Sequence, residues 1–528
     1  MSEKSKLTRA AGIVGGATFL SRIFGYIRDM VMAAFFGAGF FSDAFIAAFR
    51  IPNLFRRLFA EGSLTIAFIP VFTEYITEKG RDDAFELARS ALRLLSIILA
   101  ITAIAGVLFA PQLMDIITHG FHPEKLSLTV TLTRIMFPYI FFICLMALCM
   151  GILNALNHFA SPALAPLLLN ISMIAAMYIA SYISDDDRFR IIGLAVGVLA
   201  GGVLQLSFQI PFLVKNGFYF WQKAKIYHPG LKKIGVLMIP AVFGAAVYQI
   251  NILVGTFLAS LLPGGSITYL YYSDRLVQFP LGVFAISIGT AILPSLSRHA
   301  ANNDFHALRD TFAYSIRLIF FITLPSMVGL IVLRKPIIAL LFQRGAFTAE
   351  SVIYTADALL YYCAGLWAVS AVRVIVPTFY ALKDTKTPVR IGIISIISNI
   401  ALGIILMKHL SHCGLALATS LASIINFCLL IVALRKKLGS LGWKKIIIST
   451  FKSFACSVIM GIVVMWVIQF LIPDLLISDD KTDLSILLPG LMGGIAAGVI
   501  TYILLSIFFK SHELYDVIGV VKKRFIKE

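Results

Sequence analysis

The sequence predicts an all-α polytopic membrane protein of about fourteen transmembrane helices. Of its 528 residues, 59% are hydrophobic and 14% are charged, whereas roughly 25% of residues are charged in soluble domains. Apolar stretches of about 20 residues, long enough to cross a bilayer as a helix, recur along the whole chain. A soluble core cannot enclose so much apolar surface, so most of it is predicted to face lipid or other membrane helices.

The predicted spans follow one another with short connections. They are 11–36, 45–74, 86–110, 128–155, 162–183, 190–214, 234–262, 268–296, 310–333, 351–381, 388–408, 413–434, 446–471 and 486–509. The first apolar run contains Arg22, Arg28 and Asp29, which a cleavable signal peptide would not tolerate. We therefore expect span 1 to be retained.

The connections alternate between basic and sparsely charged. Roughly 26 Lys and Arg residues fall in the set that includes both termini, and about 8 fall in the other set. The second set includes the acidic runs 185–187 and 479–483, and its basic exception, Arg334, Lys335 and Arg344, is predicted to be a short amphipathic segment at the outer surface. This asymmetry predicts cytoplasmic termini, and it explains the net charge of +18 as a topology signal rather than as a nucleic-acid footprint.

Two short patterns recur at nearly one offset. Ala67-x-x-Pro70 recurs as Ala291-x-x-Pro294, about 224 residues later. Ala155-Leu156, followed by Ser-Pro, recurs as Ala381-Leu382, followed by Thr-Pro, about 226 residues later. These matches predict two six-helix lobes in parallel orientation, residues 1–216 and 217–436, followed by two appended spans and a tail in 437–528.

Several charged residues lie inside the apolar spans, where each Arg costs about 2.5–3.5 kcal/mol on insertion scales. They are Arg22, Arg28, Asp29, Arg50, Arg56, Arg57, Glu61, Asp274 and Arg275. Cations outnumber acids in this set, and the planar guanidinium suits bidentate binding of phosphate. We therefore predict a cationic cavity for an anionic ligand.

Helical spacing suggests how these groups could pair. Arg22 and Asp29 are seven residues apart and share a helix face, so Arg28 is expected to point elsewhere, toward a neighbouring span. Arg57 and Glu61 have the i,i+4 spacing of a helical ion pair. The alternative is that the arginines only tie the protein together internally, through Asp29, Asp43, Glu61 and Asp274, or reach to an interface.

The remaining sequence features do not indicate a catalytic or metal-binding site. Gly193, Gly197 and Gly201 form a small-xxx-small stripe typical of helix packing in membranes. The six cysteines and nine histidines show no metal-ligand spacing, and the sequence has no P-loop and no Gly-x-Ser-x-Gly elbow. Nothing therefore indicates catalysis, and no cofactor is expected beyond an undetermined coupling ion or use of the membrane potential.

Three stretches resemble the MurJ (MviN) lipid II flippases. They are Ser21-Arg-Ile-Phe-Gly-Tyr-Ile-Arg-Asp29, Phe36-Gly-Ala-Gly39 with Ser42-Asp-Ala-Phe45, and Pro52-Asn-Leu-Phe-Arg-Arg-Leu-Phe-Ala-Glu-Gly62. Tyr272-Ser-Asp-Arg-Leu276 and Phe137-Pro-Tyr139 are similar too. The resemblance covers essentially the whole chain and implies the exporter fold shared with MATE drug exporters, in a bacterial inner membrane.

The resemblance also implies a function in peptidoglycan biosynthesis, and so in cell-wall biogenesis and cell shape. The substrate would be undecaprenyl-diphosphate-linked MurNAc-pentapeptide-GlcNAc, with membrane lipids as further partners. Arg22, Arg28, Arg56 and Arg275 would bind it, and Asp29, Asp43, Pro52, Asn53, Glu61 and Asp274 would support or gate the cavity. The appended spans would form a groove for the lipid tail.

Two alternatives remain at this level. A MATE-like or polysaccharide flippase would share the fold, although a cationic-drug exporter should carry surplus acid rather than surplus Arg. A membrane enzyme acting on lipid-linked precursors would need converging acids and a metal site, and Asp185, Asp186 and Asp187 are better explained as a solvated loop.

Overall fold

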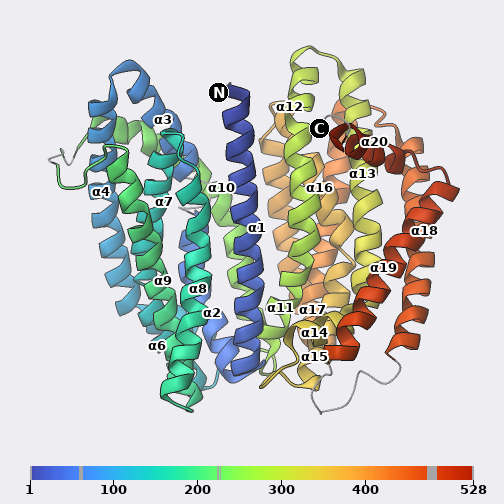
Figure 1. Ribbon diagram of the computed structural model, residues 1–528, viewed down its shortest axis with the longest axis horizontal. Helices are drawn as coiled ribbons and strands as arrows, with labels where there is room; N and C mark the ends of the chain where they lie inside the picture. The colour runs from blue at the N-terminus through green and yellow to red at the C-terminus, as the bar shows by residue number, and fades with distance from the viewer. Residues whose placement is uncertain (1–2, 59–63, 223–224, 226, 473–483, 526–528) are drawn as a thin grey trace. The chain divides into compact units, whose positions relative to one another are not determined.

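The computed structural model describes residues 3–58, 64–222, 225, 227–472 and 484–525. These residues form helices joined by short turns, with no strand among them (Figure 1). The chain divides into two compact units, Met1–Ile267 and Thr268–Glu528. The predicted all-α architecture is confirmed.

The first unit is built from ten helices among the residues described. They are α1 (Glu3–Phe36), α2 (Phe40–Phe55), α3 (Leu64–Glu78), α4 (Arg81–Leu108), α5 (Ala110–Ile117), α6 (Pro123–Met136), α7 (Tyr139–Ala155), α8 (Ala160–Ile183), α9 (Asp187–Lys215) and α10 (Pro229–Ser260). Helix α9 packs against α7 and α8, and α1 packs against α8. Helix α10 packs against α3, α4 and α5.

The second unit is also built from helices, and it includes the C-terminal helices of the chain. Its elements are α11 (Ser266–Pro280, starting two residues before the boundary), the π-helix η2 (Leu281–Ala285), α12 (Ile286–Ala301), α13 (Phe305–Val332), α14 (Arg334–Phe342), α15 (Ala349–Cys363), α16 (Leu366–Ala381), α17 (Lys386–Leu438), α18 (Trp443–Leu471), α19 (Leu484–Phe508) and α20 (His512–Phe525). The basic connection at Arg334 and Lys335 opens α14, whose residues Ile338 and Phe342 are buried.

Each predicted span overlaps a helix or an interrupted helix. Within the described residues, nine helical segments are long and apolar enough to cross a membrane, and the pair α15–α16, bent by 43°, would make a tenth. Helix α17 is two helices meeting at Ser411, where the backbone turns at φ 50°, so it covers the two spans predicted at 388–408 and 413–434. The count of fourteen membrane spans stays a prediction.

The internal repeat extends to details of the backbone. Asn157 after α7 and Lys383 after α16, about 226 residues apart, both adopt left-handed φ angles, 61° and 58°. The residue after each donates its N–H back to the helix, His158 to Leu153 at 2.8 Å and Asp384 to Phe379 at 2.9 Å, which caps the C-terminus. These matching caps agree with the predicted pseudo-repeat, which stays a prediction.

The predicted lobe boundary at residues 216 and 217 does not coincide with the boundary between the two compact units. Helix α10 begins about 226 residues after α1 and is its counterpart in the repeat. It nevertheless packs within the first compact unit, whose boundary lies at residue 267. The division into 1–216, 217–436 and 437–528 stays a prediction.

The glycine stripe on α9 packs against α8, as predicted. A Cβ atom at Gly197 would lie 2.5 Å from the Cβ of Ala176, and one at Gly193 would lie 2.6 Å from the Cβ of Ala180. The close approach lets Ser172 on α8 donate its hydroxyl to the carbonyl of Gly197 at 2.8 Å. Between membrane helices, such van der Waals contact replaces the hydrophobic driving force of soluble cores.

We therefore expect Gly197→Ala to lower the thermal unfolding temperature of the purified protein. Alanine favours helix over glycine by about 1 kcal/mol, so a loss of stability would come from the clash with Ala176 alone. Gly392→Ala on α17 is the matched control, because a Cβ there meets nothing within 4 Å. If both variants unfolded at the same temperature, close packing at Gly197 would not matter.

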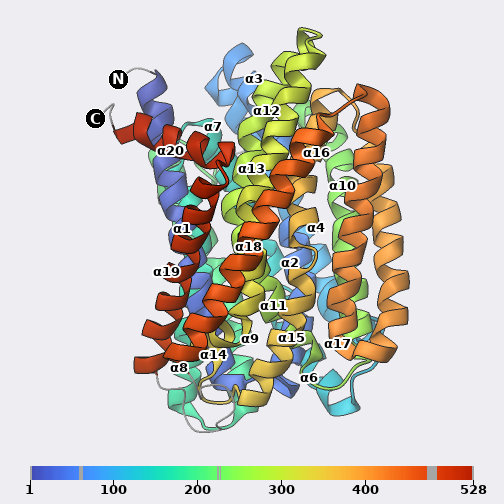
Figure 2. The same ribbon diagram turned by 90° about the vertical axis from the view of Figure 1, so that its right-hand side faces the viewer.

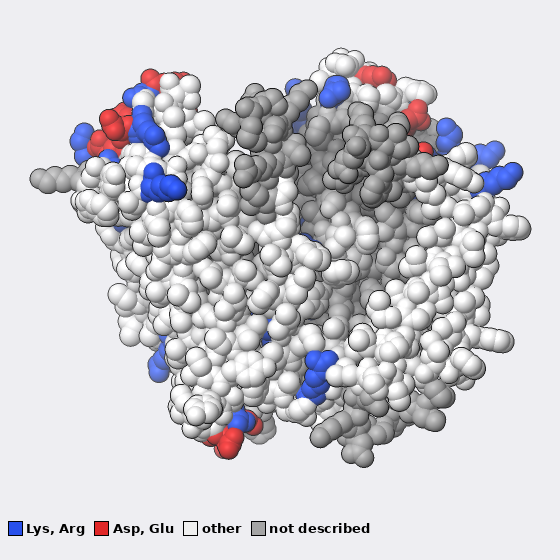
Figure 3. All heavy atoms as spheres, viewed as in Figure 1, with Lys and Arg blue, Asp and Glu red and all other residues white. Residues whose placement is uncertain are grey.

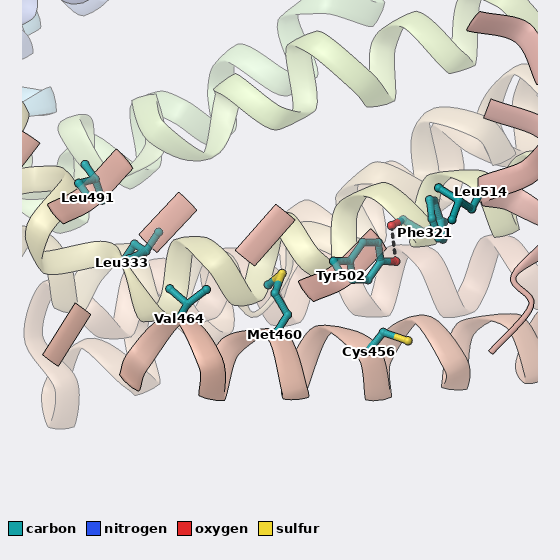
Figure 4. Close-up of a cluster of buried hydrophobic side chains, with 8 residues drawn as sticks. All are labelled: Phe321, Leu333, Cys456, Met460, Val464, Leu491, Tyr502 and Leu514. Carbon is teal, nitrogen blue, oxygen red and sulfur yellow. Dashed lines mark hydrogen bonds between the residues drawn. The ribbon is translucent and has the colours of Figure 1, made fainter. Parts of the chain in front are cut away.

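Helices α18, α19 and α20 pack against α13 through an apolar cluster. Figure 4 shows Phe321 and Leu333 on and after α13 facing Cys456, Met460 and Val464 of α18, with Leu491 and Tyr502 of α19 and Leu514 of α20. The hydroxyl of Tyr502 donates to the carbonyl of Phe321 at 2.7 Å. Figure 2 shows α18 and α19 side by side along α13.

Polar contacts also join the helices of this unit. Arg317 of α13 and Ser449 of α18 both contact the buried carboxylate of Glu513 at 2.9 Å. Lys437 pairs with Asp384 in the turn before α17, and with Thr387 it holds the pKa of Asp384 well below its usual range. On the face seen in Figure 3, most Lys, Arg, Asp and Glu side chains lie toward the top and the bottom of the view, and the surface between them is largely uncharged, as expected where a protein faces lipid.

Candidate functional site

The first candidate site centres on Arg28, in the last third of α1. Arg28 is 8% exposed and Asp29 is fully buried. Both Nε and Nη2 of Arg28 donate to Oδ1 of Asp29, at 3.1 and 2.6 Å. The expectation that Arg28 and Asp29 point apart is therefore wrong, because the long Arg side chain bends back to its neighbour.

Arg28 also reaches the neighbouring helix, as predicted. Its Nη1 donates to Oδ1 of Asn170 on α8 at 3.1 Å, with the sulfur of Met173 at 3.9 Å. The amide of Asn170 in turn donates to the carbonyl of Ser21 on α1 at 3.2 Å. Asn170 thus orients the guanidinium and ties α8 to α1.

This arrangement changes the charge balance expected for α1. A buried guanidinium is expensive in an apolar surrounding, and a carboxylate with further hydrogen bonds offsets that cost. The structure pairs Arg28 with an acid, so it is not a surplus cation in this conformation. Arg22, six residues before Arg28 on α1, is half-buried.

A second buried ion pair lies at the start of α2. Oδ2 of Asp43, 2% exposed, accepts from Nζ of Lys125 on α6 at 2.7 Å and from the backbone N–H of Gly265 at 2.7 Å. Nζ of Lys125 also lies 4.3 Å from the ring centre of Phe121. Three separate chain segments therefore meet at one carboxylate.

The turn before α2 explains why Asp43 sits there. Gly37 ends α1 with a left-handed φ of 59°, and its N–H donates to Ala33 at 2.9 Å, which is a common C-terminal cap. Helix α2 then starts at Phe40, so Asp43 lies in its first turn, where the helix dipole favours a negative charge.

The third group lies at the interrupted end of α2. Pro52 is inside this helix, which ends at Phe55, and the next residues, 56–58, are π-helical. Nε of Arg56 donates to Oδ1 of Asn53 at 3.0 Å, and both residues are half-buried. The predicted partner of Arg57, Glu61, lies outside the described residues.

The same interruption occurs in the second unit, where η2 follows Pro280. π-Helical turns are rare and often mark functional sites. Helix α11 before it carries Asp274, which is exposed, and Arg275, which is half-buried. Ser273 anchors this helix by donating to the carbonyl of Thr355 at 2.7 Å.

The predicted site residues therefore form separate groups. Arg28 joins Asp29, Arg56 joins Asn53, and Asp43 joins a residue that the sequence reading missed, Lys125. Arg275 belongs to the other compact unit, so the convergence of the four arginines on one cavity stays a prediction.

Asn170, which accepts from Nη1 of Arg28, was not among the predicted site residues either. A polar residue deep in an apolar helix is itself a signal. The same signal marks Lys125, a lone lysine at the edge of span 4. Among the described residues, no group of three or more His, Cys, Asp or Glu side chains could hold a metal ion.

Known proteins share this sequence and architecture. The family profile described as lipid II flippase MurJ matches residues 32–478. A probable lipid II flippase MurJ of Vibrio cholerae is 42% identical over 434 residues, which cover 80% of this chain and 82% of that protein.

The solved structures agree. One titled lipid II flippase MurJ, inward closed conformation, is 29% identical, with a TM-score of 0.76, and covers 94% of this chain and 98% of that one. An inward-facing multidrug-resistance MATE transporter of the MOP superfamily, 16% identical, has a TM-score of 0.69, covers 82% of this chain and 99% of that one, and indicates a shared fold alone. From the match over most of its length, the chain belongs to the lipid II flippase MurJ family.

Proposed function

We propose that this protein moves lipid II, the undecaprenyl-diphosphate-linked peptidoglycan precursor, from the cytoplasmic to the periplasmic leaflet. The observation that carries the proposal is the buried Arg28 in α1, held by Asp29 and Asn170 within a family of lipid II flippases. An intramembrane arginine is costly to keep, and binding an anionic substrate is a physical reason to keep it. The profile match favours this substrate over drug or polysaccharide transport and over an enzymatic role.

In this proposal, the diphosphate binds to Arg22, Arg28, Arg56 and Arg275. Arg22 and Arg56 are only half-buried, so their guanidinium groups retain room for a ligand. A diphosphate oxygen can replace Oδ1 of Asn170 as an acceptor for Arg28, while Asp29 keeps the guanidinium in place. Such charge-assisted, bidentate contacts substitute for the hydration that the diphosphate loses on leaving water.

Translocation then follows from alternating access. The polyprenyl tail stays in lipid while the polar headgroup crosses through a protein-lined path. Pro52, Asn53 and the π-helical residues that follow them give α2 a break at which it can bend. A membrane potential that is negative inside favours outward movement of anionic substrate by about 2.3 kcal/mol per charge per 100 mV.

Complementation tests this function. Cells depleted of their own lipid II flippase should survive and keep their shape when this chain is expressed, and vesicles prepared from them should expose lipid II on the outer leaflet. Arg188→Ala, an exposed change at the start of α9, should complement as the parent chain does. Normal membrane levels of the chain without any rescue would contradict the proposed substrate.

We further propose that both termini lie in the cytoplasm, from the Lys and Arg asymmetry of the connections. The connection after α18, which contains Ser478, would then face outward; residues 473–483 lie outside the described residues. A cysteine introduced as Ser478→Cys should react with a membrane-impermeant maleimide in intact cells. Reaction only after the membrane is permeabilised would reverse the orientation.

A further inference from the structure

A cavity of about 490 Å³ opens on the first unit, beside the middle turns of α4. It is lined by Arg89, Leu92, Arg93, Ser96, Ile97 and Phe220. None of these residues belongs to the groups around Arg28, Asp43 or Arg56. The cavity therefore combines two guanidinium groups with the apolar side chains of Leu92, Ile97 and Phe220.

Arg89 is the buried member of the pair. It is 9% exposed, and its Nη1 donates to Oε1 of Gln222 at 2.8 Å. Its Nε is buried and has no hydrogen-bond partner among the described residues. A buried charged donor without an acceptor is costly, and Arg89 carries this cost as one of the residues that line the cavity.

Arg93 lies one helical turn further along and shares the same face. It is exposed, and its Nη2 donates to the carbonyl of Gln222 at 3.3 Å. Two acids on α4 lie near Arg89: Glu86, one turn earlier, and Asp82, two turns earlier. Oε1 of Glu86 lies 3.9 Å from Nζ of Lys225. Among the described residues, the cavity lining contains two arginines and no carboxylate.

The surroundings place the cavity at a boundary between polar and apolar surface. Along α4 the exposed side chains beyond it are apolar: Ile97 is 50%, Ile101 63% and Ile104 62% exposed. On its other side, Trp221 is 71% and Tyr227 69% exposed. Exposed Trp and Tyr residues mark the headgroup level of membrane proteins.

We propose that this cavity binds an anionic glycerophospholipid of the surrounding bilayer. Its phosphate would accept from Arg89 and Arg93, since arginine forks match phosphate oxygens. One acyl chain would run down α4 along Ile97, Ile101 and Ile104. The net positive charge of the lining selects a lipid with a net negative headgroup over a zwitterionic one, and this assignment is independent of the substrate proposed above.

Native mass spectrometry of the full chain, released from mixed phosphatidylglycerol and phosphatidylcholine micelles, tests the proposal. The parent chain should retain phosphatidylglycerol in preference to phosphatidylcholine. The double variant Arg89→Gln/Arg93→Gln should retain it at least fivefold less. The matched control Lys444→Gln/Lys445→Gln removes two exposed charges at the start of α18 and should retain as much as the parent.

The proposal would be overturned by equal retention in the double variant, by equal loss in the control, or by no preference between the two lipids. Displacement by millimolar inorganic phosphate would also overturn it, because it would assign the site to a free anion rather than to a lipid. If the double variant fails to fold, Arg93→Gln alone decides. It must lower retention, while Arg89→Lys, which keeps the charge, must retain more lipid than Arg93→Gln.

Discussion

Replacing Arg28 by alanine is expected to abolish lipid II translocation. The substitution removes a residue proposed to bind the diphosphate, and it removes the guanidinium that pairs with the fully buried Asp29. Breaking a buried ion pair in this way costs about 3–5 kcal/mol, so Arg28→Ala should also lower the unfolding temperature. Lipid II exposure in vesicles and thermal unfolding in detergent measure the two effects separately.

The double variant Arg28→Ala/Asp29→Ala separates ligand binding from structure. It removes both charges, so most of the stability should return, while translocation should remain absent. Arg28→Lys keeps the charge but not the fork that reaches Asp29 and Asn170 together, so we expect poor rescue. Wild-type translocation by the double variant would mean that the pair is structural, and the diphosphate-binding role of Arg28 would then be abandoned.

Replacing Lys125 by methionine is expected to cause a large loss of stability in the first unit. Methionine keeps the length of the side chain and removes its charge, so Asp43 loses its contact at 2.7 Å with Nζ of Lys125. Because Asp43 and Lys125 are both nearly buried, the expected cost is about 3–5 kcal/mol. Thermal unfolding of the purified chain measures it.

An exposed ion pair of similar length provides the control. Lys233 and Glu74 lie 2.6 Å apart, but the two side chains are 55% and 38% exposed. Solvent screens such a pair, so Lys233→Met should leave the unfolding temperature nearly unchanged. Adding Asp43→Asn to Lys125→Met should recover much of the loss. If Lys125→Met behaved like Lys233→Met, the buried pair would contribute nothing to stability.

The Arg28 and Lys125 variants are each expected to change stability as well as transport, and they test different roles. Arg28 is proposed to contact substrate, so its effect on translocation should outlast the recovery of stability. Lys125 contacts Asp43, so its effect on translocation should disappear once stability is restored. A double variant of Asp43 and Lys125 that is stable but inactive would indicate that this pair has a role in transport.

The helices and their order were predictable from sequence. Apolar runs near 20 residues determine where helices form in a membrane, because every backbone polar group there needs an internal partner. The recurrence of Ala67-x-x-Pro70 and Ala155-Leu156 likewise predicted the repeat, which reappears in the paired caps at Asn157 and Lys383. Gly197 was predicted to pack closely, since the spacing of small residues is itself the packing signal.

The interruptions within helices were only partly predictable. Pro52 predicts a break in α2, but the π-helical residues after it and the 43° bend between α15 and α16 depend on what each segment packs against. Similarly, the repeat makes α10 the counterpart of α1, yet contacts with α3, α4 and α5 assign it to the first compact unit. Local pattern does not encode such choices.

The sequence by itself determined which residues are chemically unusual: Arg22, Arg28 and Arg56 are costly in lipid wherever they point. Only the tertiary structure decided their partners. Asn170 lies 142 residues from Arg28, and Lys125 lies 82 residues from Asp43. Helical periodicity relates residues three, four or seven apart, but contacts across such distances arise when helices pack, and a flexible arginine can then turn to the nearest acceptor.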